Sequence, residues 1–198
     1  MEQETIWTDI DRNEKDLNMA DFYFFEDVFS DKEIEEIKEL AMKYPAEVAG
    51  VGQDESVRTQ DGVRKSSVRW MRNAPYWLYE RLFECVNEAN EQMWHFTLNG
   101  AREVIQYTEY PPNGGHYDWH MDCGHGIQMQ RKISITVQLN DDYEGGDLEL
   151  WRGQNPQRAL KKKGAVVVFP SYMLHRVSPV TKGIRNSLVL WIGGDHYR

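Results

Sequence analysis

Cysteine, basic charge and long apolar runs are all scarce in this chain of 198 residues. Its two cysteines can form one disulfide bond at most, and the acidic, polar segment 1–16 lacks the pattern of an export signal. We therefore expect reduced thiols and a cytoplasmic protein. A formal net charge of −9 argues against nucleic-acid binding, which needs a basic face. No apolar run approaches the length that spans a bilayer, so we expect no membrane partner.

Apolar residues make up 40% of the sequence, and a chain of this length can bury a full core, so we expect one domain over residues 1–198. From about residue 100 to 195, short β-rich runs alternate with turn residues. These runs are EVIQYTEY, RKISITVQL, GDLELW, AVVVF and RNSLVLWIG. Their spacing predicts an all-β sandwich or barrel, with helices and loops of about residues 1–99 packed outside it.

Two helices are predicted in the first half of the chain. Ser30 followed by Glu33 is typical of a capping box and predicts a helix that runs to about Tyr44. Asn73 is the expected cap of a second helix, at about 74–93. The segment 45–67 between them shows no period and is a candidate lid over a site.

The stretch GGHYDWHMDCGH gathers three of the six histidines of the chain within residues 114–125. It contains two His-x-Asp pairs, His116–Asp118 and His120–Asp122. On a strand, such a pair points both side chains to one face, because side chains alternate. Two histidines and one carboxylate form the facial triad of non-haem Fe(II) oxygenases. Alternation does not choose between the pairs, because all four side chains would then share a face.

Two other interpretations of this stretch stay open at this point. Isolated His-x-Asp pairs are often surface or hydrogen-bonding pairs with no ligand. Cys123 and His125, together with His116 or His120, could instead bind zinc, although the chain has no paired Cys-x-x-C element.

A second informative stretch is FPSYMLHRVSPVTKGIRNSLVLWIGG, which contains His175. Arg185 follows ten residues later, and then come Ser187 and Trp191. On a strand these three side chains face the same side. An arginine and a serine that face a barrel interior are costly unless they meet an anion. The guanidinium fork fits a carboxylate, and a serine hydroxyl can donate beside it.

Together these motifs resemble the 2-oxoglutarate- and Fe(II)-dependent oxygenases of the prolyl 4-hydroxylase-like superfamily, and within it the bacterial PKHD-type hydroxylases. The family pattern is a tyrosine, then Gly-x-x-Tyr-x-x-His-x-Asp, then a distal histidine followed about ten residues later by Arg or Lys. The matching residues are Tyr110, Gly114, Tyr117, His120, Asp122, His175 and Arg185. This frame selects His120–Asp122 over His116–Asp118, and the resemblance covers about residues 100–194.

The resemblance implies an α+β, mainly β fold: a double-stranded β-helix of the jelly-roll, cupin-like kind, with the N-terminal helices packed outside. It implies that His120, Asp122 and His175 are the iron ligands and the catalytic centre. For the cosubstrate it implies Arg185 at the far carboxylate, Tyr110 as a donor and Trp191 as a wall. Where animal relatives carry a tyrosine, this chain has Gln138, with Thr136 on the same face; we expect Ser187 to supply the missing donor.

The reaction implied by the resemblance is hydroxylation of an unactivated C–H bond, with succinate and CO2 as co-products. It uses Fe(II), 2-oxoglutarate and O2, with ascorbate as a reductant. The expected substrate is a prolyl residue of a peptide or protein, and the acidic chain favours a basic one. Candidate substrate residues are Arg64, Trp70 and Tyr117, although Arg64 could be solvated and Trp70 could pack in the core.

The same fold leaves other functions open. The substrate could be a free amino acid or another small molecule, or the chain could be a non-catalytic sensor of iron or 2-oxoglutarate. A nucleic-acid demethylase is disfavoured, because Trp191 stands where that branch carries a further arginine and because the chain is acidic.

Overall fold

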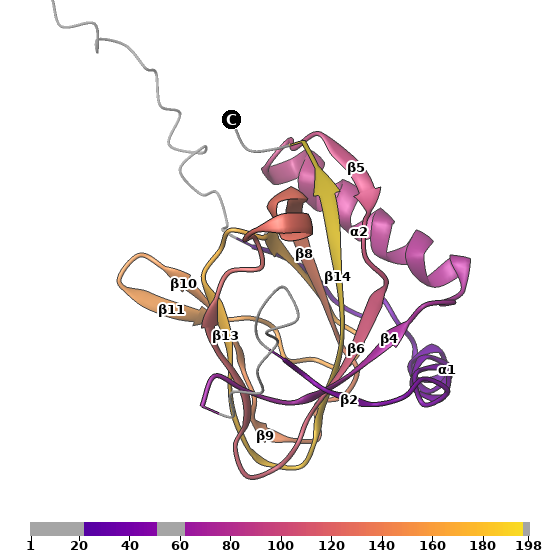
Figure 1. The fold of residues 1–198 in the computed structure, drawn as a ribbon, viewed down its shortest axis with the longest axis vertical. Coiled ribbons are helices and arrows are strands. Elements are labelled where there is room, and N and C mark those ends of the chain that lie inside the picture. The colour runs from indigo at the N-terminus through magenta and orange to yellow at the C-terminus, as the bar shows by residue number, and fades with distance from the viewer. Residues whose placement is uncertain (1–21, 51–61, 196–198) are drawn as a thin grey trace, which may run out of the picture.

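The computed structural model describes residues 22–50 and 62–195, which form two antiparallel sheets that face each other, with two helices on one side (Figure 1). The larger sheet has the order β1-β12-β8-β14-β6-β4-β2, with β5 paired to β14. Its strands are β1 (Tyr23–Phe25), β2 (Glu47–Val48), β4 (Ser67–Met71), β5 (Leu98–Ala101), β6 (Ile105–Tyr110), β8 (Arg131–Gln138), β12 (Val166–Pro170) and β14 (Arg185–Gly194). The predicted jelly-roll core is thereby confirmed in outline.

The smaller sheet has the order β11-β10-β13-β7-β3, with β9 paired to β13. Its strands are β3 (Arg64–Lys65), β7 (Gly115–His120), β9 (Glu144–Gly145), β10 (Leu148–Arg152), β11 (Asn155–Arg158) and β13 (His175–Lys182). A short 3₁₀ turn, η2 (Gly126–Gln130), leads from β7 into β8. The β10–β11 hairpin projects away from the helices (Figure 1). In the part of the chain that the structure describes, no helix combines the length and apolar character needed to cross a bilayer.

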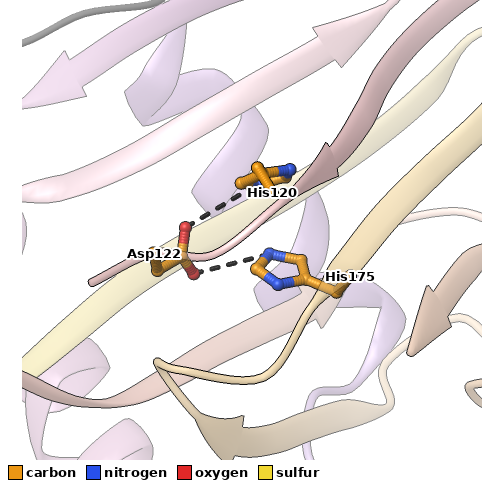
Figure 2. Close-up of side chains that lie close together, drawn as sticks. All are labelled: His120, Asp122 and His175. Carbon is orange, nitrogen blue, oxygen red and sulfur yellow. Dashed lines mark ion pairs between the residues drawn. The ribbon is translucent and has the colours of Figure 1, made fainter. Parts of the chain in front are cut away.

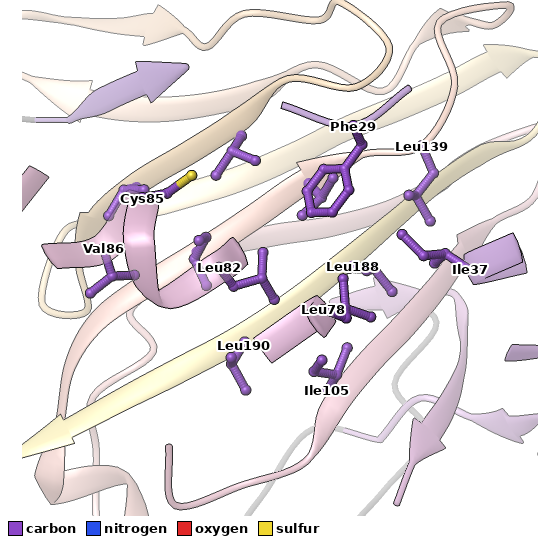
Figure 3. Close-up of a cluster of buried hydrophobic side chains, with 14 of the residues drawn as sticks. Phe29, Ile37, Leu78, Leu82, Cys85, Val86, Ile105, Leu139, Leu188 and Leu190 are labelled. Atoms are coloured by element: carbon purple, nitrogen blue, oxygen red, sulfur yellow. The ribbon is translucent and has the colours of Figure 1, made fainter. Parts of the chain in front are cut away.

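The main hydrophobic core lies between the larger sheet and the two helices, α1 (Asp31–Ala41) and α2 (Tyr76–Met93). Figure 3 shows the buried side of α2 over the apolar side chains of β14 and β6. The strand residues in it include Ile105, Ile133, Ile135, Val137, Leu188, Leu190 and Ile192. Each such side chain stabilises the fold by about 1.5–3 kcal/mol relative to an exposed one.

The opposite face of β8 and β14 is polar, because successive side chains on a strand point to opposite faces. On these two strands the residues that alternate with the core face the smaller sheet: Ser134, Thr136, Gln138, Ser187, Val189 and Trp191. Both sets are buried, apart from Val189, which is half-buried. The larger sheet therefore separates a hydrophobic core from a polar interior.

The first helix begins as predicted and the second does not. The Ser30 hydroxyl accepts a hydrogen bond from the Glu33 N–H, and the Glu33 carboxylate accepts one from the Ser30 N–H at 2.8 Å, which completes the capping box. α2 begins at Tyr76 with Pro75 as its N-cap and no side-chain cap bond, so the cap predicted at Asn73 is wrong. A residue before proline is disfavoured in helical conformation, which moves the start beyond Pro75.

The segment 45–67 is less irregular than its sequence indicates. It contains β2, β3 and the first residue of β4. Two of these strands are only two residues long, too short for a hydrophobic period to be visible. Residues 51–61, the middle of the predicted lid, lie outside the described residues.

A candidate metal centre and its cavity

His120, Asp122 and His175 meet at the end of the smaller sheet (Figure 2). His120 ends β7 and is the register partner of His175, which begins β13. Asp122 follows β7 in a turn, where its N–H donates to the Ser171 carbonyl at 2.9 Å. Its carboxylate oxygens lie 3.7 Å from His120 Nε2 and 3.6 Å from His175 Nε2. These gaps are too long for hydrogen bonds.

Both histidine rings are oriented by the backbone. His120 Nδ1 lies 2.7 Å from the Asp118 carbonyl, and His175 Nδ1 lies 2.8 Å from the Met173 carbonyl. A carbonyl only accepts, so each Nδ1 carries the proton and each Nε2 presents a lone pair toward Asp122. One ligand atom from each residue lies within 4.8 Å of the other two. This is a preformed set of three donors that fits one divalent ion.

The electrostatics of His120 and Asp122 suit a metal. Burial, and then the neighbouring His175, lower the pKa of His120 to about 3. Burial alone would raise the pKa of Asp122, but His175, His120 and Arg131, with a hydrogen bond from Ser134, hold it below the usual value of an aspartate. At neutral pH the site therefore holds a neutral imidazole beside an ionised carboxylate, and metal binding requires both.

A β-bulge distinguishes the two His-x-Asp pairs. His120 pairs with His175 and Tyr117 with Val177, so three steps on β7 match two on β13. The extra residue brings Tyr117 and His120 to the same face, where their rings stack 3.5 Å apart. His116 and Asp118 do not line the cavity, and Asp118 is exposed. The expectation that both pairs share a face is wrong, because uniform alternation does not survive the bulge.

The zinc alternative finds no support in the described residues. The one group of three metal-binding side chains found there is His120, Asp122 and His175. Cys123 and His125 lie beside it, but His125 lines the cavity rather than joining a zinc set.

A cavity of about 420 Å³ lies between the sheets and includes the three metal-binding side chains. Arg185 reaches into it and is only 1% exposed. Its guanidinium donates to the Ser187 hydroxyl at 3.1 Å and to Gln138 Oε1 at 3.2 Å, and it lies 5.1 Å from the centre of the Tyr110 ring. Its Nε is buried without a hydrogen-bond partner, and the guanidinium lies close enough to the Tyr143 hydroxyl to lower the pKa of that group, which burial raises. No carboxylate of the described residues pairs with this cation, so the pocket fits an anion.

The predicted cosubstrate residues separate into two groups. Five of them line the cavity: Tyr110, Thr136, Arg185, Ser187 and Trp191. Gln138 does not line it, and instead supports Arg185 through its amide oxygen.

The three predicted substrate residues also line the cavity. Arg64 is buried, so the alternative that it is solvated is wrong. Its guanidinium lies 4.4 Å over the Tyr117 ring. Trp70 is half-buried and faces the cavity, with its ring centre 6.4 Å from that of Trp191, rather than joining the main core.

Sequence reasoning missed Arg131. This buried side chain donates to Glu103 Oε2 at 2.6 Å and to the Asp122 carbonyl at 3.0 Å, and it lies 3.8 Å over the Trp191 ring. Alternation would place it with Ile133 on the core face. The register shift at the start of β8 turns it toward the cavity instead, and no sequence signal marks that shift.

Residues 105–193 match the family model described as the 2OG-Fe(II) oxygenase superfamily. A PKHD-type hydroxylase of Synechococcus sp. (strain CC9311) is 41% identical over 93 residues, which cover 46% of this chain and 41% of that protein. A PKHD-type hydroxylase of Sphingopyxis alaskensis is 36% identical over 123 residues, 58% of this chain and 56% of that one. The matched part of the chain therefore spans about half of the length of these curated relatives, 41% of one and 56% of the other.

Two solved structures share the fold. A Pseudomonas putida prolyl-4-hydroxylase matches with a TM-score of 0.68 and 18% identity, over 91% of this chain and 96% of that one. A Trichoplax adhaerens prolyl hydroxylase, in complex with a hypoxia inducible factor oxygen degradation domain peptide fragment, matches with a TM-score of 0.69 and 17% identity, over 90% and 86%. These similarities confirm the double-stranded β-helix predicted for the core.

Proposed function

Since the chain belongs to the 2OG-Fe(II) oxygenase superfamily through residues 105–193, we propose that it is a dioxygenase that hydroxylates a prolyl residue of a peptide or protein. Succinate and CO2 are the co-products, and ascorbate serves as a reductant. The observation that carries the proposal is one cavity that contains both a three-donor site and a buried arginine, which has no carboxylate partner among the described residues. The names of the similar proteins support the prolyl substrate.

In this proposal His120, Asp122 and His175 hold Fe(II). When bound there, the iron supplies activation of dioxygen coupled to oxidative decarboxylation of 2-oxoglutarate. Three protein ligands leave positions open for the cosubstrate and oxygen. The Ser134 hydroxyl donates to Asp122 Oδ2 at 2.6 Å and keeps that carboxylate aimed at the site.

Arg185 orients 2-oxoglutarate by binding its far carboxylate. The guanidinium already uses the Ser187 oxygen as an acceptor, so the Ser187 hydroxyl proton is available for the same carboxylate. The indole N–H of Trp191 is buried without a partner and offers a further donor. Apolar walls at Leu148, Val177 and Val189 keep water from the reacting groups.

Metal-free protein titrated anaerobically with Fe(II) and 2-oxoglutarate tests the site. We expect a visible metal-to-ligand charge-transfer band in the wild type and in Asp118→Ala, and none in Asp122→Ala. Asp118 is the matched control, because it belongs to the neighbouring His-x-Asp pair and is exposed. A folded wild type that shows no band would contradict the proposal.

Turnover tests the substrate. Prolyl peptides should stimulate succinate formation and gain one oxygen atom by mass spectrometry. Stimulation by free proline alone would identify a small-molecule oxygenase of the same fold. A band without stimulation by either substrate would favour a non-catalytic sensor.

A further inference from the structure

Two arginines reach the cavity from opposite sheets, and each lies two residues before a serine to which it donates. Arg185 on β14 donates to Ser187. Arg64 on β3 donates from Nε to the Ser66 hydroxyl at 2.9 Å. Arg64 is 9% exposed, and no carboxylate in the described part of the chain pairs with it. The cavity therefore contains a second buried cation that lacks a counter-charge, which is costly unless an anion arrives.

The position of Arg64 is fixed on two sides. Its guanidinium lies 4.4 Å over the Tyr117 ring, and that ring stacks 3.5 Å from the His120 ring. The cation–π contact holds the guanidinium plane, while Ser66 holds Nε. Both Nη groups remain as a fork of donors, the arrangement that binds a carboxylate bidentately. Only the Tyr117 ring separates an anion there from His120, a member of the metal-binding set.

The cavity is lined mainly by positive charges, although the chain as a whole is negative. Among the described lining residues there are three arginines, and the one carboxylate belongs to Asp122. Arg131 is already paired with Glu103, and the proposed function assigns Asp122 to iron and Arg185 to 2-oxoglutarate. Arg64 is then the cation left for the substrate. Electrostatics within the cavity favour an acidic substrate, although the net charge of −9 by itself favours a basic one.

We propose that Arg64 determines specificity by pairing with a carboxylate of the substrate, which is either an acidic side chain near the target proline or the α-carboxylate of free proline. This inference rests on the proposed function, because it needs Arg185 to be occupied by 2-oxoglutarate. The shared chemistry is a carboxylate close to the reacting carbon. Arg64 contacts the substrate and takes no part in holding iron.

Matched ligands test the assignment under anaerobic conditions, in protein loaded with Fe(II) and 2-oxoglutarate. The probes are capped pentapeptides with a central proline and a single Asp at each flanking position in turn, each with an Asn twin. Free L-proline with L-prolinamide forms a further pair. Binding is measured by calorimetry, so that no turnover is needed. In the wild type we expect one anionic member to bind about tenfold or more tightly than its twin, as charge-assisted hydrogen bonds allow.

Three variants separate direct pairing from general charge. Arg64→Gln should abolish the preference, and Arg64→Lys should keep only part of it. Lys65→Gln removes the same charge one residue away, where the ammonium donates to the Asn113 carbonyl outside the cavity, and should leave the preference intact. The affinity for 2-oxoglutarate, followed by the charge-transfer band, should be unchanged in all three.

The assignment is overturned if no anionic probe binds more tightly than its twin, or if the preference survives in Arg64→Gln. It is also overturned if Arg64→Gln weakens the binding of 2-oxoglutarate, because Arg64 would then bind the cosubstrate. In each of these cases, a normal charge-transfer band in the wild type leaves the proposed function standing. Absence of that band in the wild type would contradict both the proposed function and the assignment of Arg64.

Discussion

The two faces of the larger sheet share the same strands but carry different kinds of side chain. The face under the helices is closed by apolar residues such as Leu190, which is fully buried. The face toward the smaller sheet buries polar groups as deeply, including Arg185 and Ser187. Burying apolar surface stabilises the fold, whereas burying an unpaired cation costs free energy. One face therefore holds the protein together, and the other carries groups whose burial is offset only when ligands bind.

Arg185→Met should weaken ligand binding on the cavity face without destabilising the fold. Losing one member of a buried charge pair costs about 2–5 kcal/mol in binding, so we expect 2-oxoglutarate affinity to fall about a hundredfold or more. The ligand-free protein should be as stable as the wild type or more stable, because a buried cation without a carboxylate partner is gone. Titration of the charge-transfer band and thermal melting measure the two effects. A ligand-free variant that melts lower than the wild type would contradict the comparison.

Leu190→Ala is the converse change, on the helix face. Removing a buried leucine side chain should lower the free energy of unfolding by about 2–5 kcal/mol, through lost burial and the cavity left behind. The variant that remains folded should bind Fe(II) and 2-oxoglutarate with wild-type affinity. Denaturant unfolding measures the free energy of unfolding, and the anaerobic titration measures the ligand affinities. Weakened ligand binding would show that the two faces are not independent.

Ser134→Ala affects a single hydrogen bond on the cavity face. Its hydroxyl donates to Asp122 Oδ2, and losing such a contact to a metal ligand weakens metal binding by about 10–100-fold. Ser171→Ala is the matched control, because the Ser171 hydroxyl contacts the Ser134 hydroxyl at 3.0 Å. Competition with a chelator measures Fe(II) affinity. Equal losses in both variants would mean that the hydroxyl pair acts as a unit.

Ser187→Ala should have the smallest effect of the four. One neutral hydroxyl contributes about 1 kcal/mol, so we expect 2-oxoglutarate affinity to fall about fivefold, with Fe(II) affinity unchanged. A loss as large as that of Arg185→Met would show that the serine, rather than the arginine, carries the recognition of the carboxylate.

The sequence was sufficient to predict the structure wherever the chain follows a regular period or a local rule. The capping box of Ser30 and Glu33 predicted α1, and alternation along β14 placed Arg185, Ser187 and Trp191 on one face. The family spacing predicted that His175 lies beside His120 and Asp122, although these residues are far apart in the sequence.

The rest depended on irregularities that no sequence period encodes. The bulge in β7 decides which His-x-Asp pair faces the cavity, and the register shift in β8 brings Arg131 to it. Both are set by pairing with a distant strand, β13 or β14, and not by local residues. The start of α2 is different, because it is set by a local signal: Pro75 disfavours helical conformation at the residue before it.

The hydrogen bonds from His120 and His175 to carbonyls two residues back have a consequence for metal exchange. Each ring is pinned before any ion arrives, so capture of the ion needs little loss of rotational entropy and no folding of the ligand set. The apoprotein should then be a stable, fully folded form. We expect the ¹⁵N chemical shifts of its imidazoles to show Nδ1–H tautomers before iron is added, and iron to enter and leave without unfolding the chain.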